Sequence, residues 1–327
     1  APRQRLAVRA GTDAVVSADH GHAQETAGRV VARLRGAIGR AEEDSGVIGY
    51  CVPVVPAMAS YRLRVAIPMR NLGCEARIGR GNPTFFFKHQ AGDVERAVEV
   101  AQSGAGIVYD VVNDHFGGPL GDHYRMMCDL ATTVTVGSET MAARVKACTG
   151  REATVIDDPY ENDERPVGKG SGVLWFGHGA NLPSLLRVAD DLVDVDLTVC
   201  TNVQNDAFVL WTMESEYRCL ADCAVVLVTG DNPGASSNRI VKALRAGKFV
   251  VTNGGAPAWD QFRPFVWIGS VSEGIRWFEA NREEAWNKVK AGQEYVRERF
   301  SPWMIGQQWR TLFDSTLAAA TSANLDG

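Results

Sequence analysis

The chain has 327 residues, of which 45% are hydrophobic and 22% are charged, and its formal net charge is −5. This length favours two domains of about 100–200 residues each, and the composition is typical of a globular protein. The acidic balance argues against nucleic acid as the main partner. No apolar run approaches the roughly 20 residues that span a bilayer, so we expect a cytoplasmic protein, with peripheral membrane contact and oligomeric state left open.

The cysteines and histidines give no sign of a metal site. The seven cysteines are scattered, and Cys219 and Cys223 lie four residues apart without a second pair or a histidine at zinc spacing. His20 and His22 have no third ligand nearby, so a solvated loop is the simpler interpretation. We therefore expect reduced cysteines in the core, no metal and no cofactor.

Residues 1–45 differ from the rest and are interpreted as an N-terminal extension, with one amphipathic helix from Ala23 to about Glu43. From Val47 onward strands alternate with helices. Pro68 is expected to kink or shorten the helix over Tyr61–Leu72. Asp93 and Ser138 are expected to cap helices. The predicted strands are Val47–Val55, Glu75–Ile78, Thr84–Phe87, Gly106–Val112, Thr132–Val136 and Ala153–Ile156, and the other predicted helices are Asp93–Gln102, His123–Leu130 and Ser138–Ala147.

A polar stretch from Asp157 to Gly172 carries two prolines and ends in glycines, and it is the best domain boundary in the chain. We place an N-terminal domain at 46–160, a linker at 161–172, a C-terminal domain at 173–300 and a last helix at 301–327. Alternation restarts after the linker. The strands predicted there are Val173–Phe176, Leu197–Cys200, Cys223–Val228, Lys248–Val251 and Phe265–Ile268, and the helices are Pro183–Leu192, Met213–Leu220, Ser272–Asn281, Glu283–Arg299 and Pro302–Ala320.

The stretch Gly230–Gly255 is the most informative. It follows the buried strand Cys223–Val228 with a loop rich in Gly, Asn, Asp, Pro and Ser, then a helix that Ser236 or Ser237 can cap and Gly247 ends. Two βαβ domains imply two doubly wound parallel sheets that face each other across a cleft. A helix that begins at the carboxyl ends of such strands offers free N–H groups to an anion, most often a phosphate.

From Val47 to Phe313 the chain resembles the GT-B glycosyltransferases of the large retaining family 4, also called glycosyl transferases group 1. The strongest match is Asn238–Val251, which is similar to the family's helix followed by glycine and a strand. Weaker matches follow in order: Pro56–Arg64, Tyr109–Phe116, Thr133–Glu139 and Asp157–Glu161. The resemblance implies an α/β fold of two Rossmann-like domains, with the acceptor on the N-terminal domain and a nucleoside diphosphate sugar on the C-terminal one. It also implies a last helix that crosses back to the N-terminal domain.

The chain departs from the family where the acids of its Glu-x7-Glu motif belong. Alignment on Ala243, Leu244 and Gly247 puts Gly234 and Lys242 at these two positions. Asp231 is a partial substitute for the first acid. Lys242 cannot accept hydrogen bonds from ribose hydroxyls, but it can pair with a phosphate. The loop after Phe176 also lacks the family's basic residues. Both a divergent transferase and a catalytically degenerate protein fit these departures.

Four residues are candidates for catalysis. Arg239 and Lys242 are expected to offset the charge of a departing diphosphate, with simple helix capping as the alternative for the loop that precedes them. Asp114 and His115 follow a buried strand at its carboxyl end, where sites of α/β proteins form. A turn-forming aspartate and a surface histidine are the alternative there. The pKa of a free histidine suits an acid–base role.

The remaining site candidates are assigned by position and resemblance. The donor-side residues are His178, Asp231, Ser236, Ser237, Asn238, Gly254 and Gly255, and the acceptor-side residues are Ser60, Tyr61 and Arg62. Structural turns explain His178 and the two glycines equally well, and Tyr61 fits a core position. The expected function is transfer of a sugar, of the hexosyl type with retention, from a nucleoside diphosphate sugar to an unknown glycan or other small acceptor in polysaccharide or glycoconjugate biosynthesis. The alternatives are a ligand- or partner-binding GT-B protein and, less favoured, an epimerase or phosphorylase.

Overall fold

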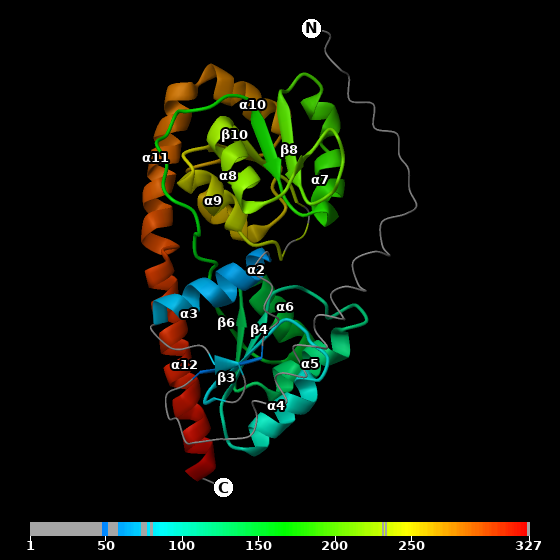
Figure 1. Ribbon diagram of the computed structural model, residues 1–327, viewed down its shortest axis with the longest axis vertical. Coiled ribbons are helices and arrows are strands. Elements are labelled where there is room, and N and C mark those ends of the chain that lie inside the picture. Colours follow the sequence, from blue (N-terminus) through cyan, green and yellow to red (C-terminus); the bar gives the residue numbers. More distant parts are fainter. Residues whose placement is uncertain are drawn as a thin grey trace. The chain divides into compact units, whose positions relative to one another are not determined.

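The computed structural model describes residues 48–51, 58–72, 77–78, 81–230, 232 and 234–325, which all belong to one compact unit that begins at Ser45. The predicted extension 1–45, with His20 and His22, lies outside the described residues, as do most of the first predicted strand and Asp231. The described part of the chain forms two six-stranded sheets, and the strands within each sheet run parallel (Figure 1).

The first sheet has the strand order β2-β1-β3-β4-β5-β6, and all of its pairings are parallel. Short loops and helices connect the strands, as the alternation in the sequence predicts. The strands are β1 (Gly49–Cys51), β2 (Arg77–Ile78), β3 (Thr84–Phe87), β4 (Ile107–Val111), β5 (Thr133–Val136) and β6 (Ala153–Val155), and the helices between them include α4 (Asp93–Gln102), α5 (Gly121–Leu130) and α6 (Glu139–Thr149).

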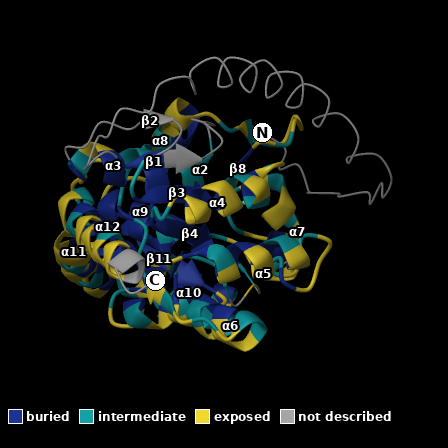
Figure 2. Ribbon diagram, turned by 90° about the horizontal axis from the view of Figure 1, so that it is seen from below, coloured by how far each residue is buried: buried dark blue, intermediate teal, exposed yellow. Residues whose placement is uncertain are grey.

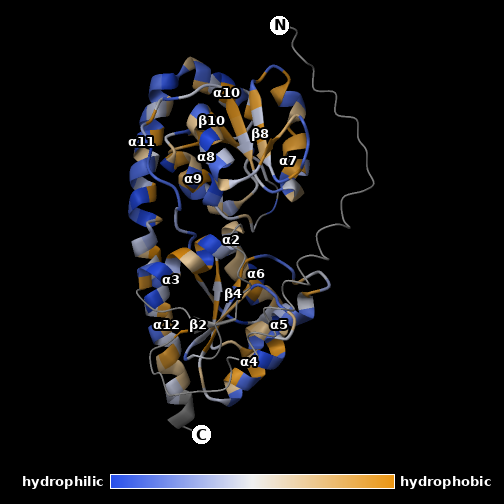
Figure 3. Cartoon of the chain, viewed as in Figure 1, coloured by the Kyte–Doolittle hydropathy of each residue, from blue (hydrophilic) through white to orange (hydrophobic). Residues whose placement is uncertain are grey.

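The second sheet has the order β12-β11-β10-β7-β8-β9, again parallel throughout. Its first strand in the chain, β7, lies between β8 and β10, so the direction of winding reverses there. Such a switch point opens a crevice at the carboxyl ends of the strands. The strands are β7 (Val173–Phe176), β8 (Leu197–Thr201), β9 (Val209–Leu210), β10 (Val225–Val228), β11 (Phe249–Thr252) and β12 (Trp267–Ile268). Figure 3 shows the hydrophobic character of β8 and β10.

Helices cover the second sheet, and short 3₁₀ turns that the sequence did not predict accompany them. The helices are α7 (Leu182–Leu186), α8 (Met213–Asp222), α9 (Asn238–Arg245), α10 (Val271–Ala280) and α11 (Arg282–Arg299), with 3₁₀ turns η2 (Gly179–Asn181), η3 (Ala189–Leu192) and η4 (Pro257–Phe262). The single helix predicted over Pro183–Leu192 is wrong, because the chain there forms α7 and η3 instead. The buried strands stand out in Figure 2.

Successive phenylalanines of β3 contribute to two different cores. Phe86 packs with Tyr109 and residues of α4–α6, whereas Phe85 and Phe87 join a second cluster on the opposite face of the sheet. That second cluster includes Trp309 of α12 (Pro302–Leu325), whose ring lies edge-on to Phe85 with centroids 5.3 Å apart. The last helix is therefore part of the core of the first sheet. None of the described helices is both long and apolar enough to cross a membrane.

The helix continues through Pro68 to Leu72, so the predicted shortening is wrong, while the kink stays a prediction. The segments α2 (Ala59–Tyr61), η1 (Arg62–Ala66) and α3 (Ile67–Leu72) are continuous, and η1 is one wide turn of π-helix. The N–H of Ile67 donates to the carbonyl of Arg62, five residues back. Proline lacks an N–H, and the wide turn just before it accommodates the missing bond.

Helix caps agree with the sequence in one case and differ in others. Ser138 accepts from the N–H of Met141, as predicted. Asp93 is not the cap of α4: Gly92 takes that position in a left-handed conformation, and the carboxylate of Asp93 accepts from the N–H of Gln90. Ser237 stands at the cap position of α9 but makes no side-chain capping bond.

Candidate functional site

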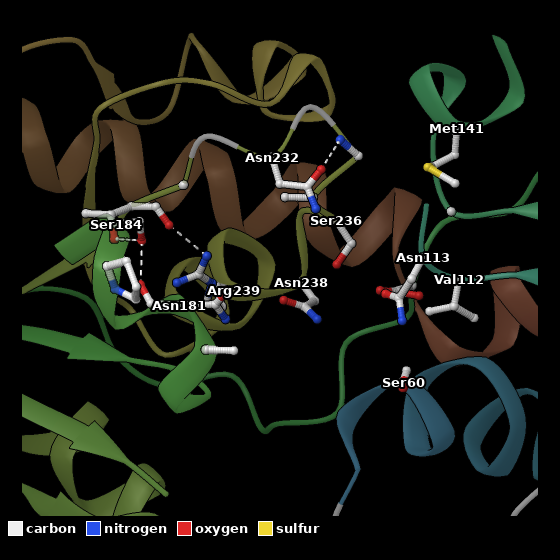
Figure 4. Close-up of a pocket in the computed structure, with 18 of the residues that line it drawn as sticks. Ser60, Val112, Asn113, Met141, Asn181, Ser184, Asn232, Ser236, Asn238 and Arg239 are labelled. Carbon is white, nitrogen blue, oxygen red and sulfur yellow. Dashed lines mark hydrogen bonds between the residues drawn. The ribbon is translucent and has the colours of Figure 1, made fainter. Parts of the chain in front are cut away.

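A pocket of about 510 Å³ lies where the loops after several strands of both sheets meet (Figure 4). Residues that follow β4, β5 and β6 form one wall. Residues that follow β7 and β10, together with the first turn of α9, form the other. The lining residues used below are Ser60, Arg64, Asn113, Met141, Asp158, Asn181, Ser184, Arg187, Thr229, Asn232, Gly234, Ser236, Asn238 and Arg239.

Arg239, in the first turn of α9, presents an unsatisfied cation to this pocket. Its Nη2 donates to the carbonyl of Thr229 at 2.9 Å, while its buried Nη1 has no hydrogen-bond partner. No carboxylate of the described residues forms an ion pair with it. Burial lowers the pKa of Arg239 to about 10, so the guanidinium remains charged at neutral pH. A buried cationic donor without a partner is the kind of group that binds an anion.

The residues around Arg239 hold it in this orientation. Ser184 and Thr229 have their hydroxyl oxygens 2.8 Å apart, and Trp175 donates its Nε1–H to Thr229 at 2.9 Å. A Cβ atom on Gly177 would lie 3.6 Å from Nη1 of Arg239 and 3.2 Å from the ring of Trp175. Glycine at 177 therefore lets the turn after β7 pass close to the guanidinium.

The opposite wall contains Arg64, which belongs to the wide turn η1. Its guanidinium binds Asp110 through two hydrogen bonds, Nη2–Oδ1 at 2.5 Å and Nε–Oδ2 at 3.0 Å, and it also donates to the carbonyl of Ile156. Thr135 donates to Asp110 at 2.8 Å. Burial opposes the charge of Arg64, but Asp110 outweighs it and raises the pKa of Arg64. This buried pair anchors the wall.

Asp158 follows β6 and lines the same wall. Its Oδ1 lies 3.6 Å from Nη1 of Arg64, and its carboxylate also interacts with the hydroxyl of Ser236. Burial raises the pKa of Asp158, against the lowering effects of Arg64 and Ser236. Among the described residues that line the pocket, Asp158 is the one acid. It thus brings a carboxylate to a wall that also carries arginine.

Lys242 belongs to a different cluster and does not line the pocket. Its Nζ lies 2.5 Å from Glu161 and 2.6 Å from Glu216, and Glu161 also accepts from Arg62 at 2.6 Å. Burial disfavours the charged form of Glu161, but the bonds from Arg62 and Lys242 lower its pKa to about 2. The expected pairing of Lys242 with a donor phosphate is therefore corrected. Two carboxylates already neutralise this ammonium group.

Asp114 and His115 are also placed differently from the sequence-based expectation. Asp114 accepts from Arg144 at 2.9 Å and from the N–H of Phe116 at 3.2 Å, so it shapes the turn. The ring of His115 packs edge-on against Tyr124, with centroids 5.3 Å apart. Neither residue lines the pocket, whereas the preceding Asn113 does. The loop is at the site, but its catalytic candidates point elsewhere.

The donor-side candidates divide into those in the pocket and those in turns. Ser236 and Asn238 line it, and Ser237 is buried beside them without doing so. His178 is exposed and accepts from the N–H of Ala180, so it caps the turn η2. Asp231 lies outside the described residues.

Gly254 and Gly255 form a turn with φ of 80° and 104°, values that favour glycine. The neighbouring Asn253 accepts from the N–H of Gly230, which places the turn beside the pocket rather than in its lining. The structure thus favours the structural interpretation of both glycines.

Of the acceptor-side candidates, Ser60 lines the pocket. Tyr61 packs against the core of the first sheet, as its alternative interpretation states. Arg62 is paired with Glu161 and lies over the ring of Trp211, with Cζ 5.9 Å from the centroid. The trio is therefore split between three environments.

Sequence reasoning missed several lining residues, namely Arg64, Asn113, Asp158, Asn181, Arg187 and Asn232. Most of them stand within a few residues of the carboxyl end of a strand, and this position was the available signal. What the sequence did not show is which side chain of each loop turns inward.

Comparison with solved structures establishes the architecture. HepE of Anabaena, in complex with UDP and glucose, is similar with a TM-score of 0.65 and 12% identity over 83% of this chain and 100% of HepE. The chain has the GT-B fold. TarM of S. aureus superposes on 70% of this GT-B chain with a TM-score of 0.55 and 12% identity, covering 55% of TarM. A trehalose-6-phosphate synthase gives 0.53 and 11% over 72% of this chain and 74% of its own.

No protein-family model matches the chain, and no curated protein sequence does either. The similarity therefore lies in the fold, at identities of 11–12% in the three structures above. The two sheets of parallel strands and the similarity to HepE confirm the predicted α/β architecture of two Rossmann-like domains.

Proposed function

We propose that the protein is a glycosyltransferase that moves a sugar from a nucleoside diphosphate sugar to an acceptor hydroxyl. Arg239 lines the pocket, and its buried Nη1, which has no hydrogen-bond partner, carries this proposal. A diphosphate supplies the negative charge and the oxygen acceptors that this guanidinium lacks. Arg239 stands in the first turn of α9, whose free N–H groups favour an anion at the same place.

In the proposed reaction the acceptor oxygen forms a bond to the anomeric carbon, and the bond from that carbon to the diphosphate oxygen breaks. The diphosphate leaves with the electron pair, and the proton of the acceptor hydroxyl passes to it or to solvent. Negative charge therefore grows on the leaving oxygen beside Arg239. A positioned cation stabilises that charge more in the transition state than in the ground state.

The structural neighbours support the donor class. HepE is described in complexes with UDP and with UDP-glucose, and the trehalose-6-phosphate synthase in a study of glycosyl transfer with retention. We extend UDP-sugar binding and retention to this chain as parts of the proposal. The wall with Ser60 and Asn113 then faces the acceptor, and Ser236 and Asn238 face the donor.

Calorimetric titration of UDP and UDP-glucose into the wild type and Arg239→Ala tests the donor site. Loss of one charge-assisted contact, worth about 1.5–3 kcal/mol, predicts roughly 10- to 150-fold weaker binding of both ligands. Arg263→Ala is the matched control, because Arg263 is exposed and paired with Asp260 away from the pocket. An intact wild type that binds neither UDP nor GDP nor their sugars would refute the proposal. So would an Arg239→Ala variant with wild-type affinity.

A second candidate is a GT-B protein that binds a ligand without transferring a sugar. It is favoured by Gly234 and Lys242 in place of the two expected acids, and by the engagement of Lys242 with Glu161 and Glu216. Release of UDP from UDP-glucose, with and without added sugar acceptors, separates the candidates. A transferase shows turnover that Arg239→Ala reduces, whereas a binding protein shows none in either form.

A further inference from the structure

The charges of the described residues that line the pocket are unequal. Three arginines, Arg64, Arg187 and Arg239, line it together with a single described carboxylate, that of Asp158. Arg64 is already neutralised by its two hydrogen bonds to buried Asp110. Asp158 approaches Arg64 only at 3.6 Å, so it is not needed to compensate that arginine. Burying a charged group costs free energy, so the presence of Asp158 as a second acid beside Arg64 requires another explanation.

Gly234, in the loop before α9, stands where the glycosyltransferases that the sequence resembles carry an acid, and Met141 lies close to it. A Cβ on Gly234 would lie 2.9 Å from Sδ of Met141 and 3.4 Å from Oδ1 of Asn232, so any side chain there displaces Met141. Asn232 in turn accepts from the N–H of Gly234 at 2.9 Å and fixes the loop (Figure 4). Among the described residues, the carboxylate that lines the pocket comes from another segment, since Asp158 follows β6.

We propose that Asp158 supplies this carboxylate and accepts a hydrogen bond from a hydroxyl group of the donor sugar. The inference rests on the proposed function. A carboxylate offers about four lone-pair positions, and Ser236 uses one of them, whereas the 3.6 Å separation from Nη1 of Arg64 is too long for a hydrogen bond. The remaining lone pairs of Asp158 are available to a ligand, because this side chain lines the pocket and is 10% exposed. Sugar hydroxyls are donors of matching chemistry. Arg64 and Ser236 therefore position Asp158, and Asp158 contributes to the choice of sugar.

The test compares UDP with UDP-sugars by calorimetric titration, using UDP-glucose, UDP-galactose and UDP-N-acetylglucosamine. The variants are Asp158→Asn and Asp158→Ala, with Asp157→Asn as the matched control, since Asp157 pairs with Arg299 and does not line the pocket. We expect UDP affinity to stay within twofold in all variants. The preferred UDP-sugar should bind at least tenfold more weakly to Asp158→Ala, about threefold or more weakly to Asp158→Asn, and normally to Asp157→Asn.

Failure of this inference is distinguishable from failure of the proposed function. If the wild type binds neither UDP nor any of the sugars, the proposed function falls. If UDP binds but no sugar adds affinity, or if the added affinity survives in both Asp158 variants, the role of Asp158 is overturned. Thermal melting checks the fold of each variant. Asp158→Asn has nearly the same shape as the wild type and decides the question if Asp158→Ala does not fold.

Discussion

Lys242 of α9 and Glu161 of the connecting segment form a buried ion pair, with Nζ and Oε1 2.5 Å apart although the residues are 81 positions apart in the chain. Glu161 also binds Arg62 of η1, and Lys242 also binds Glu216 of α8. These four side chains form a series of alternating charges, and the series connects segments that belong to both sheets. Its members are at most 12% exposed, so solvent screens it weakly.

Lys242→Met should destabilise the fold strongly, because it leaves Glu161 and Glu216 buried with one cation fewer. Breaking a buried pair costs about 3–5 kcal/mol, and chemical denaturation measures the loss. Lys146→Ala is the matched control, since Lys146 pairs with Glu152 at an exposed site, and it should cost less than about 1 kcal/mol. Equal losses in the two variants would contradict the assigned role of Lys242.

Gly247→Ala should cost more than Gly150→Ala, although both glycines end helices with nearly the same φ, 73° and 75°. A Cβ on Gly150 meets nothing within 4 Å, so only the backbone strain of about 1–2 kcal/mol applies. A Cβ on Gly247 would lie 2.6 Å from the carbonyl oxygen of Pro166, so the linker has to move as well. Urea denaturation of the two variants checks the order, and a Gly247→Ala cost no greater than that of Gly150→Ala would refute it.

Asp114→Asn and His115→Ala should leave the affinity for UDP within twofold of the wild type. Their side chains contact Arg144 and Tyr124 instead of the pocket. Asn238→Ala, which removes a lining side chain from the same pocket as Arg239, should weaken UDP binding by about two- to tenfold, as expected for one neutral hydrogen bond. Calorimetric titration measures all three. A large loss in His115→Ala would restore the sequence-based assignment.

We expect the free energy of unfolding to fall as the pH rises from about 4 to 7, because of the buried carboxyl group of Asp93. Its carboxyl group is buried, and its Oδ1 accepts no hydrogen bond and has only Arg96 at 3.8 Å; burial raises its pKa to about 7 from 3.8. The folded chain therefore keeps a proton that the unfolded chain loses near pH 4, and the free energy of unfolding falls across this interval. The change is a few kcal/mol, at about 1.4 kcal/mol per pH unit.

Asp93→Asn removes this titrating group and keeps an oxygen for the N–H of Gln90. Its free energy of unfolding, measured at pH 4 and pH 8, should exceed that of the wild type at the higher pH and change less between the two. Glu279→Gln, on the exposed side of α10, is the control. A wild-type pH slope in Asp93→Asn would contradict the buried acid as its source.

Local patterns in the sequence predicted most of the fold. The apolar run Cys223–Val228 indicated a strand buried on both faces, and β10 is such a strand. Thr84–Phe87 was predicted as a strand, and β3 has the same bounds. The loop before α9 was also correctly expected beside a pocket. These features depend on residues close together in the chain, where periodicity and turn chemistry operate.

The charged groups were harder to predict because their partners are far away in the sequence. Arg64 meets Asp110 across 46 residues, and Lys242 meets Glu161 across 81. Nothing near Lys242 indicates that two carboxylates already hold it, and nothing near Asp158 distinguishes it from a linker acid. Which side chain of a loop turns inward depends on packing between segments, as Asn113 and His115 illustrate.

The edge-on contact between Phe85 and Trp309 has a consequence for synthesis of the chain. The cluster on that face of the first sheet also needs Ile305, Leu312 and Phe313, which leave the ribosome more than 200 residues after β3. Until then the face on which Phe85 and Phe87 lie is covered only by earlier members of the cluster, such as Val65, Met69 and Leu72. Folding from the N-terminus forward therefore leaves this half incomplete until α12 arrives, and the second sheet has all its strands first.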